Sequence, residues 1–217
     1  ALDAEGRILA LRVEIVAAMG AYLHQYGPMI PNFGLSMATG LYHVPAMYGV
    51  VKGVYTNTTP TDAYRGAGRP ESTYAIERAV NALARELDMD VVDVRRLNMI
   101  KEFPAPIVSG LEIDSGDFEG ALDRGLEMLD YEGFRREQAA RRESGDAKQL
   151  GVGFSTYVEM CGLAPSRILG AISYGAGGWE SATIRFMPTG TVQVMSGATA
   201  HGQSHATTFS QIVADAF

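Results

Sequence analysis

The spacing of apolar and polar residues predicts two strands and a long helix in the first half of the chain. In residues 9–15, larger apolar residues alternate with alanine and charged residues, which is typical of a half-buried strand. The segment Tyr48–Tyr55 predicts a second strand. Helical spacing follows, because Glu71–Leu87 carries one apolar stripe and Pro70 suits the first turn of a helix.

The residues around the second strand predict long loops. From Ala21 to Pro70 the chain is rich in Gly, Pro, Tyr and Met, and apart from the strand it shows no regular period. A long irregular segment in a compact domain is usually functional or covers another part of the molecule.

Three further helices are expected before residue 148. Asp90 is placed to cap a short helix over residues 91–100. Asp117 can cap a helix that begins at Phe118, and a charged, exposed helix continues from Tyr131.

The composition changes from residue 148 onward. Residues 150–160 predict a strand, residues 181–197 predict a hairpin around a Pro-Thr-Gly turn, and residues 201–217 predict a helix entered through a glycine turn. The order of elements is neither a strict βαβ alternation nor a repeat. It predicts an α+β fold with mixed sheets and packed helices.

Composition limits the class of function. The net charge of −7 provides no basic field for nucleic acid or for a membrane surface. Apolar runs stay shorter than the roughly 20 residues that a spanning helix needs. The single cysteine, Cys161, excludes an internal disulfide framework and a multi-cysteine metal cluster, so a reducing, cytoplasmic compartment is expected. The chain begins without methionine and ends inside a helical pattern, so we expect a longer parent polypeptide.

The turn Thr61–Arg69, with the sequence TDAYRGAGR, is the first candidate site. Gly66 and Gly68 allow backbone N–H groups to approach an anion, and Arg65 and Arg69 offer bidentate donors. The helix that follows points its N-terminus at the same place. A tight loop-to-helix turn whose arginines pair with surface acids explains these residues equally well.

The segment SGATAHGQSH is the second candidate. Gly202 lets the chain pass close to a ligand, and Gln203 presents an amide that suits a heterocycle with donor and acceptor edges. His201 and His205 stand four apart, but no third ligand accompanies them, so structural roles are favoured over a metal site. Cys161 is interpreted as a buried thiol rather than a nucleophile. The loop that holds Trp179 fits a hairpin connection or a ligand-facing loop equally well.

Several segments together resemble the molybdenum-binding large subunit of the xanthine dehydrogenase and aldehyde oxidase family. They are TDAYRGAGRPESTYAIER, YVEMCGLAPS, GGWESA and HGQSHATTFSQI, and the nearest branch is that of the carbon monoxide dehydrogenase large-subunit-like proteins. The resemblance implies parts of two molybdenum-cofactor-binding domains, over residues 1–110 and 111–217. It covers nearly the whole chain.

The resemblance also implies residue roles. Arg65 would orient the substrate, and no side chain of this chain would ligate the metal. The implied cofactor-binding residues are Gly66, His201, Gly202 and Gln203, and the implied substrate pocket includes Tyr64 and Ala67.

Three departures from the family pattern carry information. Carbon monoxide-oxidising members have a cysteine directly after the arginine, where this chain has Gly66, so carbon monoxide oxidation is not expected. Ser204 stands where glycine is usual and should stiffen the turn. The family's catalytic glutamate and its first glycine-rich cofactor loop lie outside the chain.

The function implied by the resemblance is hydroxylation of an aldehyde or an N-heterocycle with oxygen derived from water. The cofactor would be a molybdenum pterin, in its cytosine dinucleotide form, and the partners would be an FAD-binding subunit and a 2Fe-2S subunit in a hetero-oligomer. The isolated chain of 217 residues is expected to lack cofactor and activity. Two alternatives remain open: a non-catalytic folded or subunit-interaction module, and a phosphate-binding module that uses the Arg65 turn.

Overall fold

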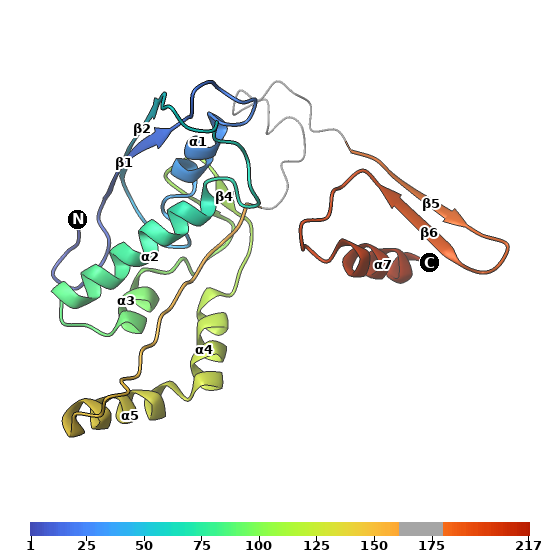
Figure 1. The fold of residues 1–217 in the computed structure, drawn as a ribbon. Helices are drawn as coiled ribbons and strands as arrows, with labels where there is room; N and C mark the ends of the chain where they lie inside the picture. Colours follow the sequence, from blue (N-terminus) through green and yellow to red (C-terminus); the bar gives the residue numbers. More distant parts are fainter. Residues whose placement is uncertain (161–179) are drawn as a thin grey trace. The chain divides into compact units, whose positions relative to one another are not determined.

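The computed structural model describes residues 1–160 and 180–217, which fall into two compact units (Figure 1). The first unit is Ala1–Glu159 and the second is Met160–Phe217. Cys161 and Trp179 lie outside the described residues. Helices and small two-stranded sheets make up both units, which confirms the predicted α+β class. None of the described helices is long and apolar enough to cross a membrane.

A parallel pair of strands forms the larger sheet of the first unit. β1 (Leu11–Ala18) pairs with β2 (Met47–Val54) in a register that places Leu11 opposite Met47. Side chains of β1 alternate between half-buried and exposed positions, as the sequence pattern predicts.

Helix α1 (Met29–Ser36) connects these strands and packs on the sheet, and the sequence did not predict it. A side chain at Gly49 of β2 would lie 2.5 Å from Leu35 Cδ1, so the glycine admits this helix against the strand. The proline and the glycine within α1 interrupt the apolar spacing that is typical of a helix. The parallel pairing requires such a crossover element, and tertiary packing here overrides weak local propensity.

Two predicted helices contribute to the main core. α2 (Arg69–Glu86) and α3 (Val91–Asn98) pack together, and the Asp90 carboxylate caps α3 by accepting from Val92 N at 2.8 Å. The most deeply buried apolar side chains of this core are Leu41, Tyr42, Val80, Ala84 and Val94.

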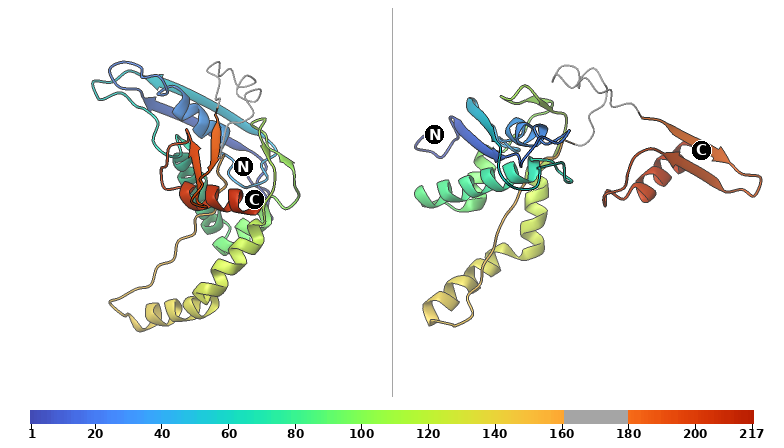
Figure 2. Two further views of the ribbon diagram at one scale, coloured as in Figure 1. Left: turned by 90° about the vertical axis from the view of Figure 1, so that its right-hand side faces the viewer. Right: turned by 45° about the horizontal axis from the view of Figure 1, so that its top comes forward.

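The rest of the first unit extends from this core. A short antiparallel pair, β3 (Ala105–Pro106) and β4 (Glu112–Ile113), precedes α4 (Phe118–Leu129) and α5 (Tyr131–Ser144). Asp117 caps α4 as predicted, accepting from Gly120 N at 2.9 Å. Further views show that α4 and α5 project from the sheet (Figure 2).

Tyr131, at the start of α5, ties this helix to the core. Its hydroxyl donates to Asp90 Oδ2 at 2.9 Å. Burial, followed by this hydrogen bond and the charge of Asp90, raises the pKa of Tyr131 to about 12.

Residues 150–160 do not form the predicted strand. This segment returns along α4 toward the core, and Val152, Phe154 and Val158 pack on the core (Figure 1). Its alternating burial resembles that of a strand, but side chains rather than a neighbouring strand satisfy its backbone. Thr156 N, for example, donates to Glu77 Oε2 at 3.0 Å.

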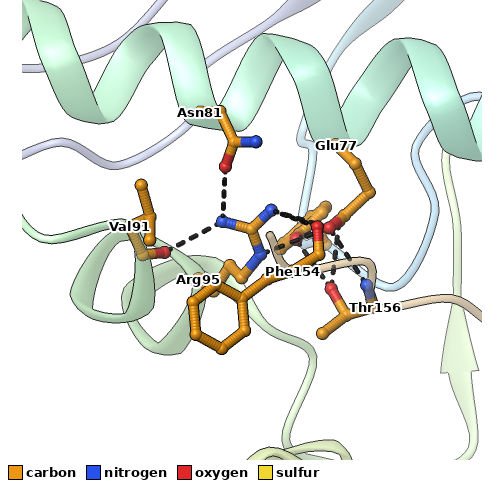
Figure 3. Close-up of polar contacts among 7 residues, drawn as sticks. Glu77, Asn81, Val91, Arg95, Phe154 and Thr156 are labelled. Atoms are coloured by element: carbon orange, nitrogen blue, oxygen red, sulfur yellow. Dashed lines mark hydrogen bonds and ion pairs between the residues drawn. The ribbon is translucent and has the colours of Figure 1, made fainter. Parts of the chain in front are cut away.

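A buried polar network holds the segment in place (Figure 3). Arg95 is fully buried and donates to Glu77 Oε2 through Nη2 at 2.7 Å and through Nε at 3.2 Å. Its remaining donors reach Asn81 Oδ1 and the backbone oxygens of Val91 and Phe154.

Tyr42 completes this network. Its hydroxyl donates to Glu77 Oε1 and also contacts Thr156 Oγ1 at 2.9 Å. Burial and the nearby Glu77 charge raise the pKa of Tyr42. Each charge of the network therefore has several hydrogen-bonded partners, as a buried ion pair requires.

Asn98 fixes the N-terminal segment to α3, and replacing it with alanine should destabilise the chain by about 2 kcal/mol. The Asn98 side chain is buried; it accepts from Ile8 N at 2.8 Å and donates to Gly6 O and Val94 O, both at 2.9 Å. Alanine would leave two buried backbone groups, Ile8 N and Gly6 O, without these partners. Urea unfolding measures the change.

Asn32 provides the matched control, because its side chain makes one exposed hydrogen bond, to Pro28 O. Asn32→Ala should change the free energy of unfolding by less than about 0.5 kcal/mol. Equal losses from the two alanine variants would contradict the role given to Asn98.

The second unit contains the predicted hairpin and helix. β5 (Ala182–Phe186) pairs antiparallel with β6 (Val192–Ser196), and Gly190 takes a positive φ of 83° in the connecting turn. α7 (His205–Ala216) follows, and its Phe209 lines a pocket with β5 and β6 residues. Many apolar side chains remain exposed, Phe186 and Ile212 among them.

Candidate functional site

The turn before α2 has an unusual backbone. Gly66, Ala67 and Gly68 adopt φ values of 99°, 45° and 91°, a run in the left-handed region that side chains disfavour. Ala67 N donates to Tyr64 O at 2.8 Å, and Arg69 N donates to Gly66 O at 3.1 Å. The turn is therefore closed by its own backbone and leads directly into the helix.

Close packing against α1 explains Gly68. A side chain there would place Cβ 2.0 Å from Ile30 O. Ser72 Oγ donates to Gly34 O at 2.5 Å, and a Cβ on Gly34 would lie 2.9 Å from Gly68 O. The sequence predicts that Gly68 lets a ligand approach the backbone closely. In the structure, Gly68 lets the backbones of two helices, α1 and α2, contact each other.

The turn lies at the carboxyl end of the parallel strands. Thr61 Oγ1 donates to Ala18 O, the last residue of β1, at 2.7 Å. Thr61 N also donates to Met19 O at 3.3 Å. The carboxyl edge of parallel strands and the N-terminus of a helix are both preferred places for ligands, the helix end for anions.

The two arginines of the turn have different surroundings. Arg65 is exposed beside Tyr64, whose exposed fraction is 87%. Arg69 is mostly buried; it forms an ion pair with Glu159 and lies 5.8 Å from the centre of the Phe33 ring. The surface-acid explanation therefore holds for Arg69. Glu159 is 90 residues away in sequence, so no local signal could have identified it.

The second candidate segment is also folded on itself. His201 N donates to Gln203 Oε1, and Gly202 takes a φ of 90°. Ser204 adopts a left-handed φ of 62°, the conformation that the glycine usual at this place takes without strain. His205 stacks on Phe209 with ring centres 4.7 Å apart. Within residues 1–160 and 180–217, no three His, Cys, Asp or Glu side chains are grouped as metal ligands.

The predicted site residues thus fall into two groups. Tyr64, Arg65, Gly66 and Ala67 share one turn of the first unit, and residues 201–203 share one turn of the second. The meeting of these two groups in a single cleft stays a prediction, as do their roles.

Comparison with known proteins identifies the domains. Models of the molybdopterin cofactor-binding domain match residues 1–99 and 124–217. The chain is 40% identical over 216 residues to the carbon monoxide dehydrogenase large chain of Hydrogenophaga pseudoflava, which covers 97% of this chain and 27% of that protein. It is 34% identical over 220 residues to the nicotine 6-hydroxylase large subunit of Paenarthrobacter nicotinovorans, covering 99% of this chain and 26% of that protein.

A solved structure agrees with these relatives. Quinoline 2-oxidoreductase from Pseudomonas putida 86 matches with a TM-score of 0.82 and 33% identity, over 99% of this chain and 28% of the other. The chain spans only 26% to 28% of the length of these three proteins. The resemblance inferred from the sequence motifs is confirmed. The chain therefore belongs to the molybdenum-binding large subunits of the xanthine dehydrogenase and aldehyde oxidase family, and it carries molybdopterin cofactor-binding domains.

Proposed function

We propose that residues 1–217 form part of a molybdenum hydroxylase large subunit that oxidises an aldehyde or an N-heterocycle with oxygen derived from water. The observation that carries this proposal is the Arg65 turn, which presents an exposed guanidinium at the carboxyl edge of two parallel strands and the N-terminus of α2. Two relatives are named for N-heterocyclic substrates, nicotine and quinoline.

The residues of both turns fit a molybdenum pterin. The Arg65 guanidinium suits an anionic or carbonyl oxygen, and the Gln203 carboxamide and the nearby glycine backbone suit the mixed donor and acceptor edge of a heterocycle. When bound, the cofactor supplies the redox chemistry of the hydroxylation. The contribution of Arg65 is to orient the substrate, and the small Ala67 leaves room beside it.

Gly66 argues against carbon monoxide as the substrate. It follows Arg65 directly, at the position where the family resemblance implies a copper-holding cysteine in carbon monoxide-oxidising members, and glycine has no side chain with which to hold that metal. A side chain at Gly66 would also contact Pro70, with Cβ 2.5 Å from its Cγ, so the turn has no space for cysteine without rearrangement. An organic substrate is therefore favoured.

The rest of the proposal concerns the assembled enzyme. The enzyme would hold the cytosine dinucleotide form of the cofactor and would assemble with a 2Fe-2S subunit and an FAD-binding subunit in a cytoplasmic hetero-oligomer. Relatives named as a large chain or a large subunit support an assembly of several chains. The same proposal places the boundary between the two molybdenum-cofactor-binding domains near residue 110.

The full-length Arg65→Ala variant should lose about tenfold or more in turnover with its aldehyde or N-heterocycle while keeping its molybdenum content. The guanidinium positions a polar substrate group, and alanine removes that contact without altering the turn backbone. Turnover is measured on the purified assembly, and molybdenum is measured by mass spectrometry. Arg78→Ala serves as the control and should keep full turnover, because Arg78 is an exposed arginine within helix α2, outside the turn.

An unchanged turnover number in Arg65→Ala would refute the orienting role. Loss of molybdenum in step with turnover would assign Arg65 to cofactor binding instead. A full-length protein that carries no molybdenum at all would favour the non-catalytic interaction module, and phosphate or nucleotide bound at this turn without metal would favour the phosphate-binding module.

A further inference from the structure

The outer edge of β1 has no strand beside it among the described residues. The sheet contains only β1 and β2, and Leu11 N and Met19 N donate to oxygens at the two ends of β2, Ala46 O and Val54 O. Backbone groups alternate in direction along a strand. The N–H groups of Arg12, Glu14 and Val16 therefore point away from β2, toward the open edge.

An apolar groove of about 520 Å³ runs along this edge. Side chains at odd and even positions of β1 lie on opposite faces of the sheet, yet both Val13 and Glu14 line the groove. The lining includes most of β1 and no residue of β2, so the groove lies on the side of β1 that faces away from β2. The groove is thus open to a neighbouring backbone.

Helix α2 forms the opposite wall, mainly with small side chains. Ser72, Ala75 and Ala79 line the groove together with the larger Glu71 and Ile76, and Ala75 is exposed. A helix that covers a strand directly usually presents larger apolar residues. The alanines leave a gap between α2 and β1 that suits the apolar side chains on one face of a further strand.

We propose that a β-strand from the part of the same subunit outside residues 1–217 pairs with the outer edge of β1 and fills this groove. The inference rests on the proposal that the chain is part of a longer subunit, but not on its reaction. The relatives show that such a subunit is long enough to contain this strand, since this chain spans only 27% of the carbon monoxide dehydrogenase large chain that it matches.

The physics of parallel sheets supports this occupant. Parallel strands are found almost only in sheets that are covered on both faces, and two strands alone are marginally stable. An open, eight-residue edge beside an apolar groove would also be a site for aggregation. A strand of the same polypeptide removes both problems.

Amide hydrogen exchange on the full-length subunit tests the proposal. If the edge is paired, the amides of Arg12, Glu14 and Val16 should exchange about as slowly as those of Val13 and Ile15, which face β2. If the edge is open, the outward amides should exchange at least about tenfold faster than the inward ones, and the proposal fails. The measurement needs no turnover, so its failure is distinct from failure of the hydroxylase assignment.

A series of protein concentrations tests the other possible occupant of the groove, which is a second copy of the chain. Protection that appears only at high protein concentration would indicate pairing with a second copy of the chain and would overturn the proposal. Protection that is independent of concentration supports a strand of the same subunit.

A matched pair of substitutions tests the groove itself. Ala75→Asp would place a charge under the added strand and should lower the melting temperature of the full-length subunit by several degrees. Ala140→Asp is the control, because Ala140 is also exposed on a helix, α5, and lies outside the groove. Equal shifts from the two variants would count against a strand in the groove.

Discussion

Replacing Arg95 with methionine is expected to lower the free energy of unfolding by about 4 kcal/mol. Arg95 has no exposed side-chain surface and is the cation paired with Glu77, whose side chain is 5% exposed. Methionine fills similar volume but leaves the Glu77 carboxylate buried without its cation. Urea unfolding followed by circular dichroism measures the loss.

Two further variants locate the cause of that loss. The double variant Glu77→Leu, Arg95→Met should be more stable than Arg95→Met alone, because it removes the uncompensated charge. Arg124→Met should stay within about 0.5 kcal/mol of wild type, since the Arg124–Glu127 ion pair is exposed. A loss from Arg95→Met no larger than that from Arg124→Met would contradict the structural role of the network.

Local sequence signals predicted the elements whose stabilising interactions join residues that are close together in sequence. Helix α2 follows from its apolar stripe and the caps of α3 and α4 from Asp90 and Asp117, because each of these involves residues within a few positions of one another. The hairpin β5–β6 follows from alternation around a glycine turn. These signals are physical and short in range.

The failures of prediction all involve partners far away in sequence. The segment at residues 150–160 has the alternation of a strand, but its hydrogen bonds go to Glu77, about 80 positions earlier. Helix α1 contains proline and glycine and depends on its contact with the sheet and α2. No local pattern encodes either arrangement.

The candidate site was located by motif, but its supporting contacts were not. Arg65 lies in the predicted turn at a helix N-terminus, as its sequence indicated. The contacts that fix this turn, between Gly68 and Ile30 and between Arg69 and Glu159, join segments that sequence spacing does not connect. Glycine in such a turn is ambiguous, because both a ligand and a packed backbone favour it.

Replacing Gly68 with alanine should destabilise the chain by about 3 to 4 kcal/mol, through left-handed strain and a steric clash together. Its φ is 91°, and the added Cβ would lie 2.0 Å from Ile30 O, a backbone atom of α1 that a rotamer change cannot move. Relief requires α1 and α2 to separate. The turn that carries Arg65 would shift with α2, so the full-length variant should also lose turnover. Urea unfolding measures the first effect and steady-state kinetics the second.

Gly145→Ala separates strain from clash. Gly145 ends α5 with a φ of 68°, and a Cβ built there meets nothing within 4 Å. Alanine at this position should therefore cost about 1 kcal/mol, the left-handed strain alone. The difference between the two variants isolates the contact between α1 and the turn. If Gly68→Ala lowered the free energy of unfolding no more than Gly145→Ala does, packing against α1 would not explain the glycine. Close approach of a ligand would then be the better explanation for glycine at this position.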